Sequence, residues 1–372
     1  MRRFFHLAHL SAGFIAVLVG YTSSAAIVFQ AATAAGAEAA HLASWLLALG
    51  LGMGATCIGL SLRYRSPVLT AWSTPGAALL GTALIGVPMG EAVGAFLFAS
   101  TLMAVLGFTG VIEHLIKRVP KALAAAMLGG VLVRFGLGVF TALQSSLVLV
   151  AAMLVVYFAG RRWNSRYTIP WTLLCGLAVA GFAGQIHLDA IHWAPAAPAF
   201  FAPVFSVSTI VGVGIPLFIV TMASQNVPGI AVLRANGYTT PASPLIGWTG
   251  VTGMALGAFG GFQFNLAAIT AAICMSPEAD QDPQRRYLAA VWAGVFYVLT
   301  GFLGATVASV FGALPPGLVA AISGIALFGT IGNSLTAALG EERSREAALV
   351  TFLGTASGLT LAGIGSAFWG LL

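Results

Sequence analysis

Two polar segments interrupt the apolar stretches of this chain, and they constrain its fold more than any other feature. The first is residues 70–76 (TAWSTPG), and the second, about 190 residues later, is residues 261–267 (GFQFNLA). In a lipid bilayer, irregular backbone is tolerated only where it is buried in protein or lines a cavity. Two breaks in corresponding positions are typical of transporters that bind their substrate near the membrane midplane.

The composition indicates the class of protein. Hydrophobic residues make up 59% of the chain and charged residues 7%, whereas a soluble domain carries about 25% charged residues. The sequence therefore predicts an all-α polytopic membrane protein that contacts the lipid bilayer. A chain of 372 residues has room for at most about 14 spans of about 20 residues each.

Apolar runs bounded by charged residues, proline or glycine predict where these spans lie. They fall at residues 9–31, 41–61, 67–86, 91–112, 120–138, 140–160, 168–186, 206–233, 243–259, 262–276, 287–308 and 315–338. Residues 345–372 form either one tilted helix or two short ones. With a cytoplasmic N-terminus, fifteen of the sixteen basic residues lie on the cytoplasmic side, as the positive-inside rule requires. Arg134 is the exception, and we expect it at the outer interface.

Two similar segments indicate an internal repeat. Residues 119–132 (VPKALAAAMLGGVL) match residues 314–327 (LPPGLVAAISGIAL), and the same offset of 195 places Gln30 opposite Gln225. The offset contains seven spans, and an odd number inverts the second copy. The sequence thus predicts a 7+7 inverted repeat and favours two short helices at the C-terminal end. The alternative is a chance match between segments rich in alanine and glycine.

Each break reads as a short extended segment followed by a half-helix. In the first, Thr74 is the expected N-cap of a helix that ends near residue 85 and spans about half the bilayer. In the second, Asn265 is the expected N-cap of a helix that ends near residue 275. In an inverted repeat the two helix N-termini face each other, and their free N–H groups and partial positive charges suit a carboxylate. The alternative is a pair of re-entrant loops without a ligand.

The remaining polar residues refine this site. Gln225 and Asn226 lie within an apolar span that Pro228 interrupts, so they must face a cavity or another helix. Tyr21 and Gln30 in the first span are weaker candidates. All ten acidic residues fall in loops or at span ends, so no carboxylate lies in the middle of a span as a proton relay. This favours an anion that travels with a proton over a neutral substrate. The alternative is that Glu91 or Glu113 reaches inward from a span end.

Several functions are not expected. The basic residues are scattered, which indicates orientation signals and no nucleic-acid partner. Cys57, Cys175 and Cys274 lack any metal-binding spacing, so neither a metal nor a cofactor is expected. A P-loop, a GxSxG motif and an HExxH motif are also absent, which argues against an enzyme. Glycines four residues apart, at 50 and 54 and at 253, 257 and 261, predict close helix packing.

Three segments resemble the benzoate/proton symporter family of the BenE type. They are residues 70–79 (TAWSTPGAAL), 223–238 (ASQNVPGIAVLRANGY) and 260–274 (GGFQFNLAAITAAIC), and the resemblance extends over essentially the whole chain. It implies the fold of UraA-like nucleobase carriers and SulP-type anion transporters. The two repeats would be residues 1–200 and 201–372, with spans 1–4 and 8–11 as a core domain and spans 5–7 and 12–14 as a gate domain.

The resemblance also implies a function and a site. The function is import of benzoate or a similar aromatic carboxylate with protons, by alternating access, across a bacterial inner membrane. A homodimer is left open, as are a carrier of another organic or inorganic anion and a passive anion channel. Nucleobase carriers place a carboxylate on span 8, where this chain has Gln225, and this departure favours an anion. The implied substrate-binding residues are Tyr21, Ser73, Thr74, Gly76, Gln225, Asn226, Phe264 and Asn265.

Overall fold

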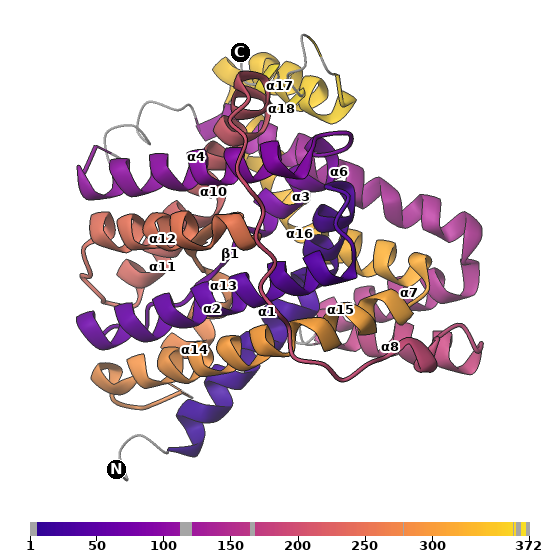
Figure 1. The fold of residues 1–372 in the computed structure, drawn as a ribbon, viewed down its shortest axis with the longest axis horizontal. Helices are drawn as coiled ribbons and strands as arrows, with labels where there is room; N and C mark the ends of the chain where they lie inside the picture. Colours follow the sequence, from indigo (N-terminus) through magenta and orange to yellow (C-terminus); the bar gives the residue numbers. More distant parts are fainter. Residues whose placement is uncertain are drawn as a thin grey trace.

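The computed structural model describes residues 6–111, 121–163, 168–277, 279–359, 361 and 366–369. Most of them are helical (Figure 1). The longer helices are α1 (Leu7–Ala34), α2 (Ala39–Tyr64), α4 (Met89–Phe108), α6 (Lys121–Ser145), α7 (Leu147–Trp163), α8 (Thr168–Phe182), α12 (Ala242–Leu256), α14 (Tyr287–Phe302), α15 (Gly304–Ala313), α16 (Pro316–Leu339) and α17 (Arg345–Ser357).

The helices confirm a multi-pass membrane protein. By length and composition, five helices in the described ranges can cross a membrane, and up to seven can if each of two bent pairs is one span. One bent pair is α14 and α15, which meet at 67°. The span predicted at residues 287–308 is therefore not one straight helix. The count of fourteen spans stays a prediction.

The predicted span at residues 206–233 is helical but irregular. Short α-helices α9 (Val207–Thr209), α10 (Ile215–Thr221) and α11 (Val227–Ala235) alternate with two π-helical turns, η2 (Ile210–Gly214) and η3 (Met222–Asn226). A π-helical turn inserts an extra residue per turn and is frequent at functional sites. The turn η3 holds both amide residues that the sequence singles out in this span.

The two breaks meet in space. Strand β1 (Thr70–Trp72) pairs antiparallel with β2 (Phe264–Leu266), and Ala71 lies opposite Asn265. Helix α3 (Thr74–Ala83) follows the first strand and α13 (Ile269–Met275) the second. Two short helices, each preceded by a strand, are thus confirmed.

Both predicted N-caps are wrong. The N-cap of α3 is Ser73, whose Oγ accepts a hydrogen bond from the N–H of Gly76 at 3.1 Å. The N-cap of α13 is Ala268, and Asn265 lies in the middle of β2. The strand pairing explains the shift, because the ladder continues beyond β2 through a bond from the N–H of Ala267 to the carbonyl of Leu69. This keeps the second break extended and delays the start of its helix.

Helices far apart in the sequence pack closely. Figure 1 shows α2 beside α14 and α4 beside α12, and these pairs are in extensive contact, as are α6 and α16. A Cβ added at Gly50 would lie 2.5 Å from the Cα of Gly301, and one at Gly54 would lie 2.8 Å from the carbonyl oxygen of Gly294. A Cβ at Gly253 would lie 2.3 Å from the Oγ of Ser100. The predicted role of these glycines in helix packing is confirmed.

An extended segment, residues 191–206, crosses one face of the molecule between α8 and α9 (Figure 1). Its N–H groups donate to helix ends that are distant in sequence. Ala196 bonds to Phe302 at the end of α14, and Val204 bonds to Gly90 at the start of α4, both at 2.8 Å. The segment therefore ties several helix ends together on this face.

The C-terminal part contains α17 and a short helix, α18 (Ser366–Trp369), in agreement with the two-helix alternative. The guanidinium of Arg134, on α6, lies beside Gly358, which ends α17 with a φ of +71°. A cation at this position complements the negative end of the helix dipole. Arg134, the one basic residue that the sequence does not place on the cytoplasmic side, therefore contacts the C-terminal end of α17.

Candidate functional site

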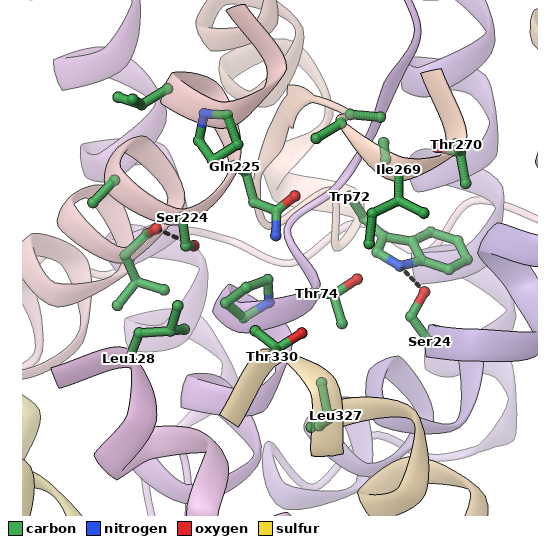
Figure 2. Close-up of a pocket in the computed structure, with 18 of the residues that line it drawn as sticks. Ser24, Trp72, Thr74, Leu128, Ser224, Gln225, Ile269, Thr270, Leu327 and Thr330 are labelled. Atoms are coloured by element: carbon green, nitrogen blue, oxygen red, sulfur yellow. Dashed lines mark hydrogen bonds between the residues drawn. The ribbon is translucent and has the colours of Figure 1, made fainter. Parts of the chain in front are cut away.

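A cavity of about 1380 Å³ lies beside the paired strands (Figure 2). Its walls come from α1, β1, α3, the π-helical turn η3, α13, and helices α6, α7 and α16. Both sequence halves contribute, and the two half-helices begin at its edge. The cavity is thus placed where the sequence predicts a binding site.

The starts of both half-helices line this cavity. Thr74 and Pro75 contribute from α3, and Ile269 and Thr270 contribute from α13. The first turn of a helix has N–H groups without intrahelical partners, and it carries a partial positive charge. In α3, Pro75 has no N–H and the N–H of Gly76 bonds to Ser73, which leaves the N–H of Thr74 for a ligand. The antiparallel pairing of β1 and β2 brings the two helix starts to the same cavity.

Polar side chains project into the cavity from three directions. Figure 2 shows the Gln225 amide reaching toward Thr74, with Thr330 of α16 across from them. Ser224 also lines the cavity, but its hydroxyl donates to the carbonyl of Val220 in its own helix. Of the two amides of the π-helical turn, Gln225 lines the cavity and Asn226 does not, so Gln225 is the amide presented to a ligand.

Much of the remaining wall is apolar and partly aromatic. Trp72 is fixed by a bond of 2.9 Å from its Nε1 to the Oγ of Ser24. Ile269 and Leu327 also line the space (Figure 2). A flat apolar group can pack against such walls while a polar group reaches the helix starts.

The charges around the cavity favour an anion. Among the described residues that line it, none is acidic and Arg161 is the one charged side chain. Two helix N-termini add partial positive charge. A carboxylate would meet no opposing carboxylate on the walls that the structure describes.

Two of the eight predicted substrate-binding residues line the cavity, and the other six lie outside its lining. Thr74 and Gln225 line the cavity. Ser73 is buried at the α3 cap, where its Oγ lies 2.7 Å from that of Thr221. Gly76 is buried beside it in the first turn of α3.

Two aromatic candidates lie behind the wall. Tyr21 packs edge-to-face on Trp72 with ring centroids 4.8 Å apart. Phe264 is buried, and its ring contacts Gly52 of α2. Neither residue is part of the cavity lining, and their contact with substrate stays a prediction. Gln30, the weaker candidate, donates to the Oγ of Ser323 on α16 at 3.0 Å.

Asn226 and Asn265 both make hydrogen bonds to the backbone of β2. The Oδ1 of Asn226 accepts a bond of 2.9 Å from the N–H of Leu266, which attaches the π-helical turn to β2. Its Nδ2 points at the sulfur of Met222 at 3.2 Å. The Nδ2 of Asn265 donates to the carbonyl of Leu266, and its Oδ1 is buried without a partner in the described part of the chain. Direct substrate contact by either residue stays a prediction.

Sequence reasoning missed several lining residues. Trp72 belongs to the first break but reads only as an extended residue of high strand propensity. Thr270 falls inside the second half-helix, where the misplaced N-cap hides its position in the first turn. Thr330 of α16 carries no local signal, because single threonines are common in apolar helices. It could have been found only by knowing which face of α16 meets the half-helices.

Comparison with known proteins identifies relatives along the whole chain. The family model described as "Benzoate membrane transport protein" matches residues 3–372. The inner membrane protein YdcO of Escherichia coli (strain K12) is 48% identical over 363 residues, which cover 98% of this chain and 93% of that protein. The benzoate membrane transport protein of Acinetobacter baylyi (strain ATCC 33305 / BD413 / ADP1) is 39% identical over 360 residues, 97% of this chain and 91% of that protein.

Solved structures show the same fold at low sequence identity. The transmembrane domain of the cyanobacterium bicarbonate transporter BicA has a TM-score of 0.64 at 13% identity, covering 95% of this chain and 99% of that one. SLC26A9 has a TM-score of 0.65 at 12% identity, covering 97% of this chain and 63% of that one.

The fold and its relatives define a multi-pass membrane transport protein and not an enzyme, as the sequence predicts. The chain belongs to the benzoate membrane transport protein family, the BenE family. The resemblance that the three sequence segments indicate is thereby confirmed.

Proposed function

We propose that this protein is a secondary active transporter that imports benzoate or a similar aromatic carboxylate together with protons across the bacterial inner membrane. The observation that carries the proposal is the cavity at which two helix starts converge. It has apolar walls and no acidic side chain among its described lining residues. Membership of the BenE family and the name of the Acinetobacter relative support the same substrate class.

The cavity offers different surfaces to the two ends of such a substrate. We place the carboxylate near the Thr74 hydroxyl, the first turn of α3 and the Gln225 amide, where donors and partial positive charge converge. The aromatic ring packs against Trp72 and Ile269. A small inorganic anion would use the same donors but leave the apolar wall without a partner.

Alternating access follows from the proposed domains. In this proposal, fourteen segments form a 7+7 inverted repeat with a cytoplasmic N-terminus. Supporting this, α3 and α13 begin at Thr74 and Ile269, which are 195 residues apart. The cavity lies between residues of the proposed core and residues of the proposed gate. Movement of one domain against the other would then open the cavity to either side.

The second candidate function is transport of another anion, and the fold shared with a bicarbonate transporter favours it. Counterflow separates the two. Proteoliposomes preloaded with unlabelled benzoate should take up external labelled benzoate with a transient overshoot, which a channel does not produce. Unlabelled aromatic carboxylates should suppress the overshoot, and bicarbonate or sulfate should not. No overshoot with benzoate, together with an overshoot of labelled bicarbonate or sulfate in vesicles preloaded with that anion, would assign the second function.

A further inference from the structure

Arg161 is a charged residue whose role the substrate site does not explain. It lies in the last turn of α7 and is exposed, yet it lines the cavity. No other charged side chain does so among the described lining residues. Its neighbour Arg162 is equally exposed and lies outside the lining.

The other lining residues near helix ends show that Arg161 belongs to the mouth of the cavity. Ile169 lies at the start of α8, and Asn333 and Ala337 lie in the last two turns of α16. The exposed side chain of Arg161 reaches solvent, so the part of the cavity that these residues line is its rim. In the proposed topology this rim faces the cytoplasm.

We propose that Arg161 attracts carboxylate anions to this mouth and speeds their entry into the cavity. The inference rests on the proposed function. The substrate site at Thr74 and Gln225 belongs to the half-helices and η3, whereas Arg161 belongs to α7. An exposed guanidinium acts on the approaching anion through its field, and a mouth lined by one sign of charge raises the local anion concentration.

The physical signature of this role is its salt dependence. A unit charge a few ångströms from an anion in water changes the encounter equilibrium about fivefold. The Debye length shrinks from about 30 Å at about 0.01 M salt to about 8 Å at about 0.15 M. Arg161 should therefore raise kcat/KM at low ionic strength and have little effect on kcat.

The test uses inside-out membrane vesicles, which present the cytoplasmic face to the medium. Initial rates of labelled benzoate transport are compared for the wild type, R161Q, R161K and R162Q, with ionic strength set by a bulky sulfonate salt. R161Q should lower kcat/KM about fivefold at about 0.01 M salt and much less at about 0.15 M. R161K, which keeps the charge, and R162Q, which lies outside the lining, should match the wild type.

Equal values of kcat/KM for R161Q and R162Q would overturn the inference. A decrease in kcat/KM for R161Q that does not change with salt would overturn it as well. Thermal unfolding of each purified variant is the control that tests whether R161Q folds as the wild type does. If wild-type vesicles carry no benzoate, the proposed function fails, and the role of Arg161 fails with it. If they do carry it, only the comparison of the two arginine variants decides this inference.

Discussion

Gln225 is the side chain on which the proposed substrate site most depends. Its amide points into the cavity from the π-helical turn η3, opposite the start of α3 (Figure 2). Gln225→Ala should weaken equilibrium binding of labelled benzoate to the purified protein by at least about tenfold, because a bond to a charged group is lost in a shielded site. Gln225→Glu should weaken it further, because it places a like charge beside the carboxylate.

Gln30→Ala is the matched control for this prediction. Gln30 is also an amide in a long helix, but it bonds to Ser323 and does not line the cavity. Its removal should leave the benzoate affinity within about twofold of the wild type. Equal losses in the two variants would mean that Gln225 acts on the fold and does not contact the ligand.

Asn226 and Asn265 should differ in their effect on stability, although both are fully buried. Asn226→Ala removes the acceptor for the N–H of Leu266 and leaves that donor buried without a partner, which costs about 1–3 kcal/mol. Asn265→Ala removes a bond to the neighbouring carbonyl and an already unpaired oxygen. Thermal unfolding in detergent should show the larger decrease in Tm for Asn226→Ala, and the reverse order would contradict this account.

The sequence could identify Thr74 and Gln225 because a polar side chain in an apolar span requires a partner. It could not tell which of the adjacent amides, Gln225 or Asn226, faces the cavity. That choice depends on the π-helical turn, which changes the angular position of consecutive residues. It also could not place the caps, because β1 and β2 pair although Thr70 and Leu266 are 196 residues apart in the sequence.

At the scale of the elements, the C-terminal end of the half-helix α13 is connected to α1. The Nε2 of His9 on α1 lies 2.7 Å from the Oδ2 of Asp280, in the loop after α13. The Nη1 of Arg286 donates to the carbonyl of Met275, the last residue of α13, at 2.8 Å. This His9–Asp280 contact and the arginine fix the C-terminal end of the half-helix.

The stability of this connection should depend on pH. Burial raises the pKa of Asp280, but bonds from the N–H of Asp282 and from His9, together with Arg285, outweigh burial and hold the pKa below its ordinary value. A carboxyl group with a depressed pKa stabilises the fold above its unfolded-state pKa, near 4, and loses this effect as pH falls through its folded-state pKa. Asp280→Asn should lower the Tm at pH 7.

The measurement is the difference in Tm between the wild type and Asp280→Asn as a function of pH. The difference should shrink as the pH falls below about 4, where protonation of the carboxyl group removes its effect. Asp282→Asn is the control for a general charge effect in this loop. A difference in Tm that grows as the pH falls below about 4 would have the wrong sign and would contradict the assignment.

The sequence predicts helical elements well where a long apolar run is bounded by charge, as in α2 and α16. It misses the bend between α14 and α15 because no proline or polar break marks Leu303, where the chain turns. The extended segment of residues 191–206 falls between two predicted spans and contains three prolines, but the pattern does not show what it contacts. Its N–H groups are satisfied by carbonyls and hydroxyls of distant helices, and such partners depend on tertiary structure.

At the scale of the whole molecule, the one-sided distribution of basic residues predicts the topology. In a background without Cys57, Cys175 and Cys274, single cysteines at Asp189 and Gln281 should label from outside and from inside respectively. Both positions are exposed loop residues, so access depends on sidedness alone. The predicted inside position at residue 164 lies outside the described residues. Labelling of the Gln281 position by an external reagent would reverse the proposed orientation.

In the proposed function, an aromatic carboxylate crosses the membrane together with a proton. The cavity holds no acidic group among its described lining residues, so the proton is expected to accompany the substrate and the pair carries no net charge. A membrane potential performs work only on net charge moved, about 2.3 kcal/mol per elementary charge per 100 mV. Transport should therefore follow the proton gradient and not the potential.

The most direct measurement is the initial rate of labelled benzoate uptake into proteoliposomes, with protein-free liposomes as the control for passive entry of benzoic acid. One set of vesicles receives an inward proton gradient, and a second receives a potassium-diffusion potential at equal pH on both sides. We predict protein-dependent stimulation by the proton gradient and little response to the potential. No protein-dependent uptake, or strong stimulation by an inside-negative potential, would contradict the electroneutral symport proposed for this chain.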